Sequence, residues 1–251
     1  MDLQPHYTEP AGLARQMRDQ GWAALSPQGV CELTGCDLPG LMALRPTWEG
    51  LPPDNHLRDG GRYRWRRHAC FVVEGERLRQ APHRAHWQPL EYNALHGGML
   101  RHFEPMLPGV VQGALWQRLL CGLGLACSAL SQGAARPPAG SPPAWFVEAH
   151  QFRIDTTGGI GRPTPEGAHR DGVDYVAVFL VDRHGIKGGE TRVFQANSPL
   201  GQRFTLTDPW CLLLLDDQRV IHESTPIQPL AAHGWRDTLV LTFRAGGFLG
   251  D

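Results

Sequence analysis

The carboxyl-terminal part of the chain alternates between short apolar runs and turn residues. Turns separate the runs at intervals of about ten residues, which is typical of an antiparallel sandwich or barrel and not of alternating strands and helices. The pattern predicts a mainly β fold with flanking helices, a double-stranded β-helix (jelly roll, cupin-like). The runs are WFVEAHQFRI (145–154), DYVAVFLVD (174–182), ETRVFQ (190–195), QRFTLTD (202–208), WCLLLLDD (210–217), VIHESTPI (220–227) and DTLVLTFR (237–244).

The first part of the chain mixes helical and extended patterns. Residues 11–20 predict an amphipathic helix that ends at Gly21, and residues 22–25 predict a strand. Ser26 and Pro27 then supply the cap and first turn of a second helix.

Two longer elements and a loop follow before the β-rich part. Residues 61–73 predict a strand, and residues 108–130 the longest helix, with a break near Gly122 and Gly124. Residues 131–144 form a Pro/Gly/Ala loop without an apolar period. No internal repeat is found, so residues 1–251 are predicted to form one catalytic domain. The elements of 1–144 would pack on the barrel strands of 145–251.

Composition removes several classes of function. The formal net charge of −1 offers no basic surplus for nucleic acid. We find no stretch near the ~18–20 apolar residues of a membrane span, and the start MDLQPHYTEP lacks the basic and apolar parts of a signal peptide. The six cysteines form no Cys-x-x-Cys pair and are expected to stay reduced. We expect a cytoplasmic protein without nucleic-acid or membrane partners, and its oligomeric state is left open.

Three residues form a candidate metal site. His169 and Asp171 are one residue apart, which at the end of a strand places both side chains on one face. His222 follows the apolar strand WCLLLLDD. Two imidazoles and one carboxylate can occupy one face of an octahedral iron(II) and leave three positions for 2-oxoglutarate and O₂. His83 and His86 have a ligand-like spacing but lie in an irregular Pro-rich stretch, so a metal role is not favoured.

An arginine is expected to hold the distal carboxylate of 2-oxoglutarate, because a guanidinium is always charged and donates two parallel hydrogen bonds. Arg236 opens the strand RDTLVLTFR after His222, and Thr238 shares its face. Arg244 has the same parity but lies about 26 Å further along at roughly 3.3 Å per residue. Arg236 and Thr238 are therefore the predicted pair, with a surface ion pair of Arg236 as the alternative.

These segments resemble a bacterial 2-oxoglutarate/Fe(II)-dependent dioxygenase family that includes the L-isoleucine 4-hydroxylases and a biofilm- and stress-associated relative. The resemblance implies that His169, Asp171 and His222 bind Fe(II) and that Arg236 holds 2-oxoglutarate. It also implies hydroxylation or sulfoxidation of a small free L-amino acid, with release of succinate and CO₂. The matching stretches are QFRI (151–154), PTPEGAHRDGVDYV (163–176), GGET (188–191), DDQRVIHESTPI (216–227) and WRDTLVLTF (235–243), with weaker ones at 63–71 and 91–105.

A free amino acid requires a cation for its carboxylate and an anion for its ammonium group. Arg153 and Glu166 are the predicted substrate-binding residues, against the alternatives of an interstrand ion pair for Arg153 and a solvated loop position for Glu166. Rival functions are a cupin-like metalloprotein of other activity and a catalytically idle stress-response binding protein. A peptide or protein substrate is a third alternative.

Overall fold

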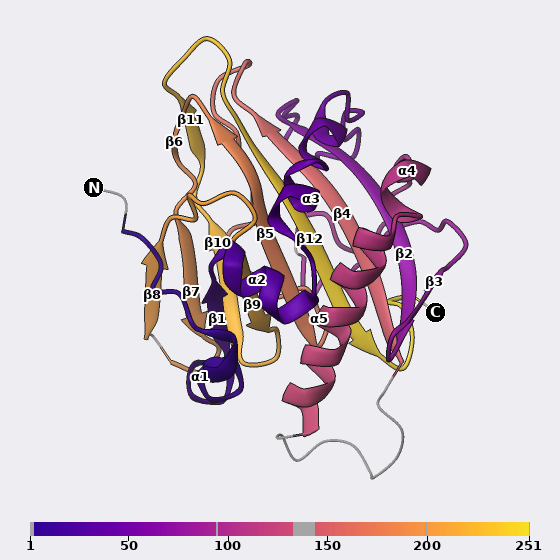
Figure 1. Cartoon of the computed structure of the whole chain (residues 1–251). Coiled ribbons are helices and arrows are strands. Elements are labelled where there is room, and N and C mark those ends of the chain that lie inside the picture. The colour runs from indigo at the N-terminus through magenta and orange to yellow at the C-terminus, as the bar shows by residue number, and fades with distance from the viewer. Residues whose placement is uncertain (1–2, 94, 133–143, 199, 251) are drawn as a thin grey trace.

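The computed structural model describes residues 3–93, 95–132, 144–198 and 200–250, so most of the predicted 131–144 loop lies outside the described residues (Figure 1). The helices are η1 (Pro10–Gly12), α1 (Leu13–Gln20), α2 (Pro27–Thr34), α3 (Leu38–Met42), η2 (Arg45–Trp48), α4 (Pro108–Val111) and α5 (Ala114–Gln132). The strands are β1 (Trp22–Leu25), β2 (Arg64–Glu74), β3 (Arg77–Gln80), β4 (Trp145–Asp155), β5 (Tyr175–His184), β6 (Ile186–Gly188), β7 (Thr191–Gln195), β8 (Gly201–Phe204), β9 (Leu212–Asp216), β10 (Val220–Ser224), β11 (Ile227–Pro229) and β12 (Trp235–Ala245).

The strands form antiparallel sheets, and the predicted mainly β jelly roll is confirmed. The large sheet has the order β1-β9-β5-β12-β4-β2-β3, and two small sheets have the orders β10-β7-β8 and β11-β6. Strands β1 and β2 come from the first part of the chain and pair with β9 and β4, which belong to the predicted barrel. The amino-terminal segment therefore extends the large sheet, in addition to placing helices on it.

The two faces of the large sheet carry two different apolar clusters. On β5, Tyr175, Ala177 and Phe179 belong to the cluster that also contains the buried side of α5. Their neighbours Val176 and Leu180 belong to a second cluster, which includes residues of β7, β8 and β10. This alternation follows from the two-residue period of a strand. Helices thus cover one face of the large sheet, and the small sheet β10-β7-β8 packs on the other (Figure 1).

The predicted break of the long helix lies at a different place. The chain leaves the helix at residues 112–113, between α4 and α5, and α5 continues through Gly122 and Gly124. A Cβ atom at Gly122 would lie 2.6 Å from the Cα of Thr34, and one at Gly124 would lie 2.8 Å from a methyl carbon of Val73. These glycines therefore allow close packing of α5 against its neighbours and do not break it.

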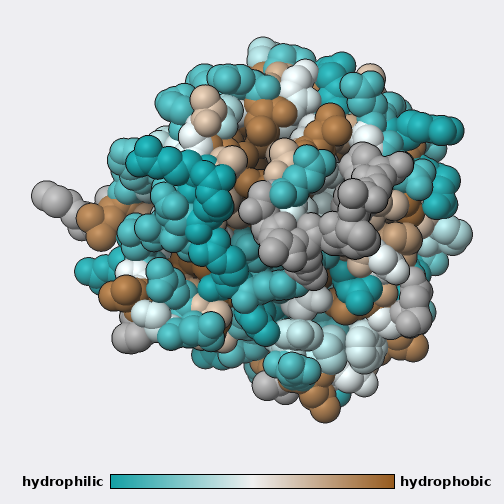
Figure 2. Space-filling model, turned by 90° about the horizontal axis from the view of Figure 1, so that it is seen from below, coloured by the Kyte–Doolittle hydropathy of each residue, from teal (hydrophilic) through white to brown (hydrophobic). Residues whose placement is uncertain are grey.

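Helix α5 is a long apolar helix that belongs to the core. With 19 residues and a mean hydropathy of 1.2, it is long and apolar enough by composition to cross a bilayer. In the fold, however, Trp116, Leu119, Leu120 and Leu123 are buried in the main core, as in the core helix of a globular enzyme. On the face shown in Figure 2, hydrophilic side chains predominate and hydrophobic ones form small groups.

The short amino-terminal elements agree with the sequence predictions. Helix α1 ends at Gly21, whose φ of 76° places it in the left-handed region that favours glycine. Helix α2 begins after Ser26, whose hydroxyl accepts a hydrogen bond from the Gly29 N–H.

Candidate active site

The three predicted metal ligands converge. His169 lies outside the named strands, and its backbone pairs with that of His222 in β10 through two N–H···O bonds of 3.0 Å. The Nε2 atoms of His169 and His222 lie 3.7 and 3.8 Å from the two carboxylate oxygens of Asp171. One potential ligand atom from each residue lies within 4.8 Å of the other two.

The hydrogen bonds and pKa values of this group suit a metal ion. The Nδ1–H of His169 donates to the Gly167 carbonyl at 3.0 Å, which leaves the lone pair on Nε2, next to Asp171. Burial and the neighbouring His169 lower the pKa of His222 to about 4, so its ring is neutral at pH 7. Burial by itself would lower the pKa of His169, but the carboxylates of Asp171 and Glu166 outweigh it and raise that pKa. A divalent cation between these donors would replace the proton.

Two further residues hold the Asp171 segment in place. The buried carboxylate of Asp217 accepts the backbone N–H groups of three successive residues, at 3.0 Å from Asp171, 2.7 Å from Gly172 and 3.1 Å from Val173. The Nε2–H of Gln88 donates to the Asp171 carboxylate at 3.1 Å. Burial, and then Asp171, raise the pKa of Asp217 to about 7. Sequence reasoning missed both residues, although Asp217 ends the run WCLLLLDD that was used to place His222.

Arg236 and Thr238 line the same cavity as the three ligands. Arg236 is only 4% exposed, and its Nη2 has no hydrogen-bond partner among the described residues. Burial and the nearby Arg183 lower its pKa to about 10, so the guanidinium stays charged at neutral pH. An unpaired buried cation beside a hydroxyl fits the distal carboxylate of 2-oxoglutarate. Arg244 instead donates to the backbone carbonyls of Gly247 and Phe248 and does not line this cavity.

The cavity has a volume of about 130 Å³ and lies on the face of the large sheet that is opposite to α5. Glu166 lines it, as predicted for a substrate contact; its Oε1 lies 3.7 Å from His169 Nε2, and its Oε2 is buried without a partner among the described residues. The other lining residues are Arg64, Arg66, His86, Gln88, Asn93, Arg101, His150, Phe152, Ile154, Pro163, Thr164, Val178, Ser224, Val240 and Thr242.

Arg153 does not reach this cavity. Its guanidinium makes a bidentate ion pair with Asp237, at 2.8 and 2.7 Å, and lies over the ring of Trp235. Arg153 and Asp237 are directly opposite each other on β4 and β12. The structure therefore shows the interstrand ion pair that was the alternative for Arg153, and it does not place this residue in the cavity as the predicted substrate contact requires.

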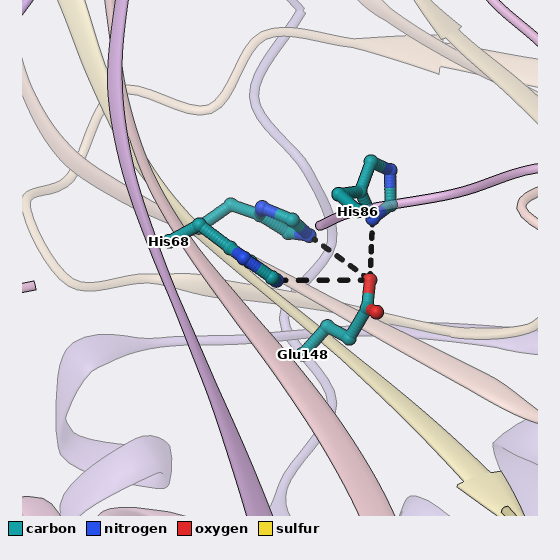
Figure 3. A group of neighbouring side chains, drawn as sticks. His68, His86 and Glu148 are labelled. Carbon is teal, nitrogen blue, oxygen red and sulfur yellow. Dashed lines mark hydrogen bonds and ion pairs between the residues drawn. The ribbon is translucent and has the colours of Figure 1, made fainter. Parts of the chain in front are cut away.

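A second group of potential ligands consists of His68, His86, Glu148 and His150 (Figure 3), and two of them, His86 and His150, also line the cavity. Histidine nitrogens surround one carboxylate oxygen, Glu148 Oε2, at 2.5 Å from His86 Nδ1, 3.7 Å from His150 Nε2 and 3.9 Å from His68 Nε2. All four residues are buried. His86 was not predicted to bind metal, and its neighbours here come from β2 and β4.

Hydrogen bonding in this second group argues against a metal ion. Arg66 Nη2 lies 2.6 Å from His150 Nδ1, and a guanidinium can only donate, so Nδ1 of His150 is the acceptor. Burial, and then Arg66, hold the pKa of His150 well below its usual range, so the ring is neutral and its proton is on Nε2. The rings of His68 and His150 stack at 4.6 Å with an interplanar angle of 15°. These contacts describe a hydrogen-bonded network around Glu148.

Comparisons with known proteins agree with this geometry. The family model described as 2OG-Fe dioxygenase matches residues 45–242. The crystal structure of a bsmA homolog from Methylobium petroleophilum PM1 is 51% identical, covers 98% of this chain and 97% of that chain, and has a TM-score of 0.88. No curated protein matches the chain significantly.

Two more distant structures share the fold alone. IDO from Bacillus thuringiensis is 18% identical with a TM-score of 0.71, and the two chains are covered over 95% and 100% of their lengths. The Fe(II)/(alpha)ketoglutarate-dependent dioxygenase TqaL is 20% identical with a TM-score of 0.70, over 96% of this chain and 88% of that chain. With the family match over most of its length, the chain belongs to the 2OG-Fe dioxygenases, enzymes that use iron(II), 2-oxoglutarate and O₂.

Proposed function

We propose that this enzyme oxidises a small free L-amino acid, with His169, Asp171 and His222 as the iron ligands and with Arg236 and Thr238 as the 2-oxoglutarate clamp. The observation that carries the proposal is the convergence of the three ligands and a buried, unpaired Arg236 on one cavity. Family membership supports an oxygenase over a cupin-like protein of other activity or an idle binding protein.

The metal supplies the redox chemistry when it is bound: O₂ and 2-oxoglutarate are converted to succinate and CO₂, and one oxygen atom enters the substrate. The chain's own residues bind, orient and exclude water. The Gly167 carbonyl accepts the Nδ1–H of His169, so the lone pair on Nε2 stays free to bind the ion. Arg236 and Thr238 orient the distal carboxylate of the co-substrate, and the apolar side chains of Phe152 and Val240 limit water in the cavity.

Glu166 supports an amino-acid substrate. Its carboxylate faces the cavity with one buried oxygen unpartnered among the described residues, next to His169. A substrate ammonium group would supply the missing donor and a compensating charge. The cavity volume of about 130 Å³ suits a small molecule. The resemblance to L-isoleucine 4-hydroxylases and a cytoplasmic location remain predictions.

A turnover screen tests the proposal. The enzyme is loaded with Fe(II) and given 2-oxoglutarate and single free L-amino acids, and succinate and the oxidised product are measured by mass spectrometry. We expect at least one amino acid to stimulate succinate release and to gain one oxygen atom. An enzyme that binds Fe(II) but releases no succinate with or without an amino acid would contradict the oxygenase site. Release stimulated only by peptides would contradict the substrate class.

A further inference from the structure

We propose that Arg101 forms an anion subsite of the cavity that binds a free carboxylate group of the substrate. The inference rests on the proposed function, because it assigns the cation that Arg153 does not supply. It also narrows the substrate class to a small molecule with its own carboxylate, which excludes a residue inside a peptide chain.

Arg101 is a buried cation without an ion-pair partner. It is 2% exposed and lines the cavity, and no carboxylate lies within 4.0 Å of its guanidinium among the described residues. Its Nη2 donates to Gln88 Oε1 at 2.8 Å, and its Nε has no partner. A buried charge that is left unpaired is costly, so an anionic ligand at this position would be strongly favoured.

The neighbouring arginines strengthen the positive charge. Arg64 and Arg66 share the single carboxylate of Asp54, at 2.8 and 3.7 Å. Each of these arginines is buried and lines the cavity, and each has one buried nitrogen without a partner, Nη2 of Arg64 and Nε of Arg66. Glu148 and Glu166 also attract Arg101, but from more than 4.0 Å away, so Asp54 is the only carboxylate among the described residues that forms an ion pair with any of the three arginines. The oxygens of a substrate α-carboxylate would accept hydrogen bonds from the N–H groups that have no partner.

The position of Arg101 is fixed relative to the metal ligands. Its backbone forms an antiparallel bridge with His86, with two N–H···O bonds of 2.9 Å. Gln88 accepts the Arg101 hydrogen bond through its oxygen and donates to Asp171 through its nitrogen, at 3.1 Å. One side chain thus joins the anion subsite to a predicted iron ligand. A substrate carboxylate at Arg101 would therefore be held on the side of the cavity that Gln88 links to Asp171.

The first test compares ligands on the wild-type enzyme and requires no mutation. The probes are a mixture of the proteinogenic L-amino acids, the matching α-hydroxy acids and the matching L-amino acid carboxamides, each with 2-oxoglutarate. Two responses are measured: succinate release with Fe(II), and the change in Tm with Mn(II) in place of iron. We expect carboxylates to act in both assays and the carboxamides to be about 10- to 100-fold weaker, because loss of the charge removes a charge-assisted contact.

The second test uses Arg101→Met, Arg101→Lys and the matched control Arg62→Met, which changes an exposed arginine just before β2. Arg101→Met is expected to raise the KM for the active carboxylate about 10- to 100-fold, Arg101→Lys to retain part of the binding, and Arg62→Met to match the wild type. If Arg101→Met does not fold, Arg101→Lys and the comparison of acids with carboxamides test the anion subsite.

The outcomes separate this inference from the proposed function. Three results would overturn the anion subsite. They are carboxamides that are as active as the acids, a wild-type KM in Arg101→Met, and the absence of any response to the carboxylate probes in both assays. A response to α-hydroxy acids and not to amino acids supports the anion subsite and refutes the amino-acid substrate. A response to amino acids that does not depend on Arg101 leaves the proposed function standing and refutes the subsite.

Discussion

Replacement of Arg236 by methionine separates co-substrate binding from folding. Arg236 is 4% exposed, and its guanidinium remains charged at neutral pH and has a buried Nη2 without a partner among the described residues. A buried unpaired charge costs stability, whereas methionine fills a similar volume without one. We expect Arg236→Met to be as stable as the wild type, or more stable, when no 2-oxoglutarate is present.

When 2-oxoglutarate is added, the wild type should become more stable than Arg236→Met. A charge-assisted bidentate contact is worth about 1.5–3 kcal/mol, so the variant should bind 2-oxoglutarate about 10- to 150-fold more weakly. At a concentration of 100 times the wild-type Kd, ligand binding stabilises the wild type by about 2.7 kcal/mol. The same concentration stabilises the variant by only about 0.3–1.4 kcal/mol. For a chain of this length the wild-type Tm should rise by about 5–10 °C, and that of the variant by much less.

The assay is thermal unfolding with Mn(II), across a titration of 2-oxoglutarate. Arg244→Met is the matched control, because Arg244 lies on the same strand and face but donates to the carbonyls of Gly247 and Phe248. It should respond to 2-oxoglutarate like the wild type. A normal Tm rise in Arg236→Met, or a lost rise in Arg244→Met, would show that the wrong arginine was chosen as the clamp.

Three further predictions concern the metal and the core. Asp217→Ala removes the acceptor of three backbone N–H groups that shape the Asp171 segment, so Mn(II) affinity measured by titration should fall about 10- to 100-fold; an unchanged affinity would contradict a positioning role. Metal analysis of the Fe(II)- or Zn(II)-loaded enzyme should find one ion per chain. The hydrogen bond from Arg66 to His150 Nδ1 leaves the proton on His150 Nε2, so this nitrogen cannot bind a second ion. A second equivalent of metal that disappears in Glu148→Gln would refute this prediction. Gly122→Ala should lower the free energy of unfolding by about 1–3 kcal/mol, measured with denaturant, because the new Cβ would lie 2.6 Å from Thr34 Cα. The control Gly109→Ala should be neutral or stabilising, because a Cβ there would have no atom within 4 Å. Equal stabilities of the two variants would contradict the close packing of α5.

Strand positions were predictable because each apolar run carries its own two-residue period and its own turn signals. The runs at 145–154, 174–182 and 237–244 correspond closely to β4, β5 and β12. The short strands β3 and β6 were missed, since RLRQ and IKG contain too few apolar residues to show a period. The glycines of α5 were misinterpreted because intrinsic helix propensity counts against glycine, while the benefit of close packing depends on a partner that lies far away in the sequence.

Some residues of the candidate site could be predicted from the sequence and others could not. The convergence of His169, Asp171 and His222 was predictable from a local spacing and from the order of strands. Gln88, Arg101 and Asp217 depend on hydrogen bonds between loops, and no periodic pattern marks such residues. Arg101 lies within the stretch 91–105, which resembles the dioxygenase family. The proposed role of Arg101 rests on the absence of a nearby counter-charge, which the sequence does not show.

The position of Arg153 depends on the register between two strands. On β12, Arg236 and Thr238 face the cavity, so Asp237 between them faces the other side of the sheet. Strand register pairs Asp237 with Arg153, and directly opposed residues of an antiparallel pair share a face. Arg153 therefore had to face away from the cavity once this register was known, whereas Phe152 and Ile154, opposite Thr238 and Arg236, had to line it. Parity within one strand was available from the sequence, but the register between two strands 80 residues apart was not, and a shift of one residue would have reversed the assignment.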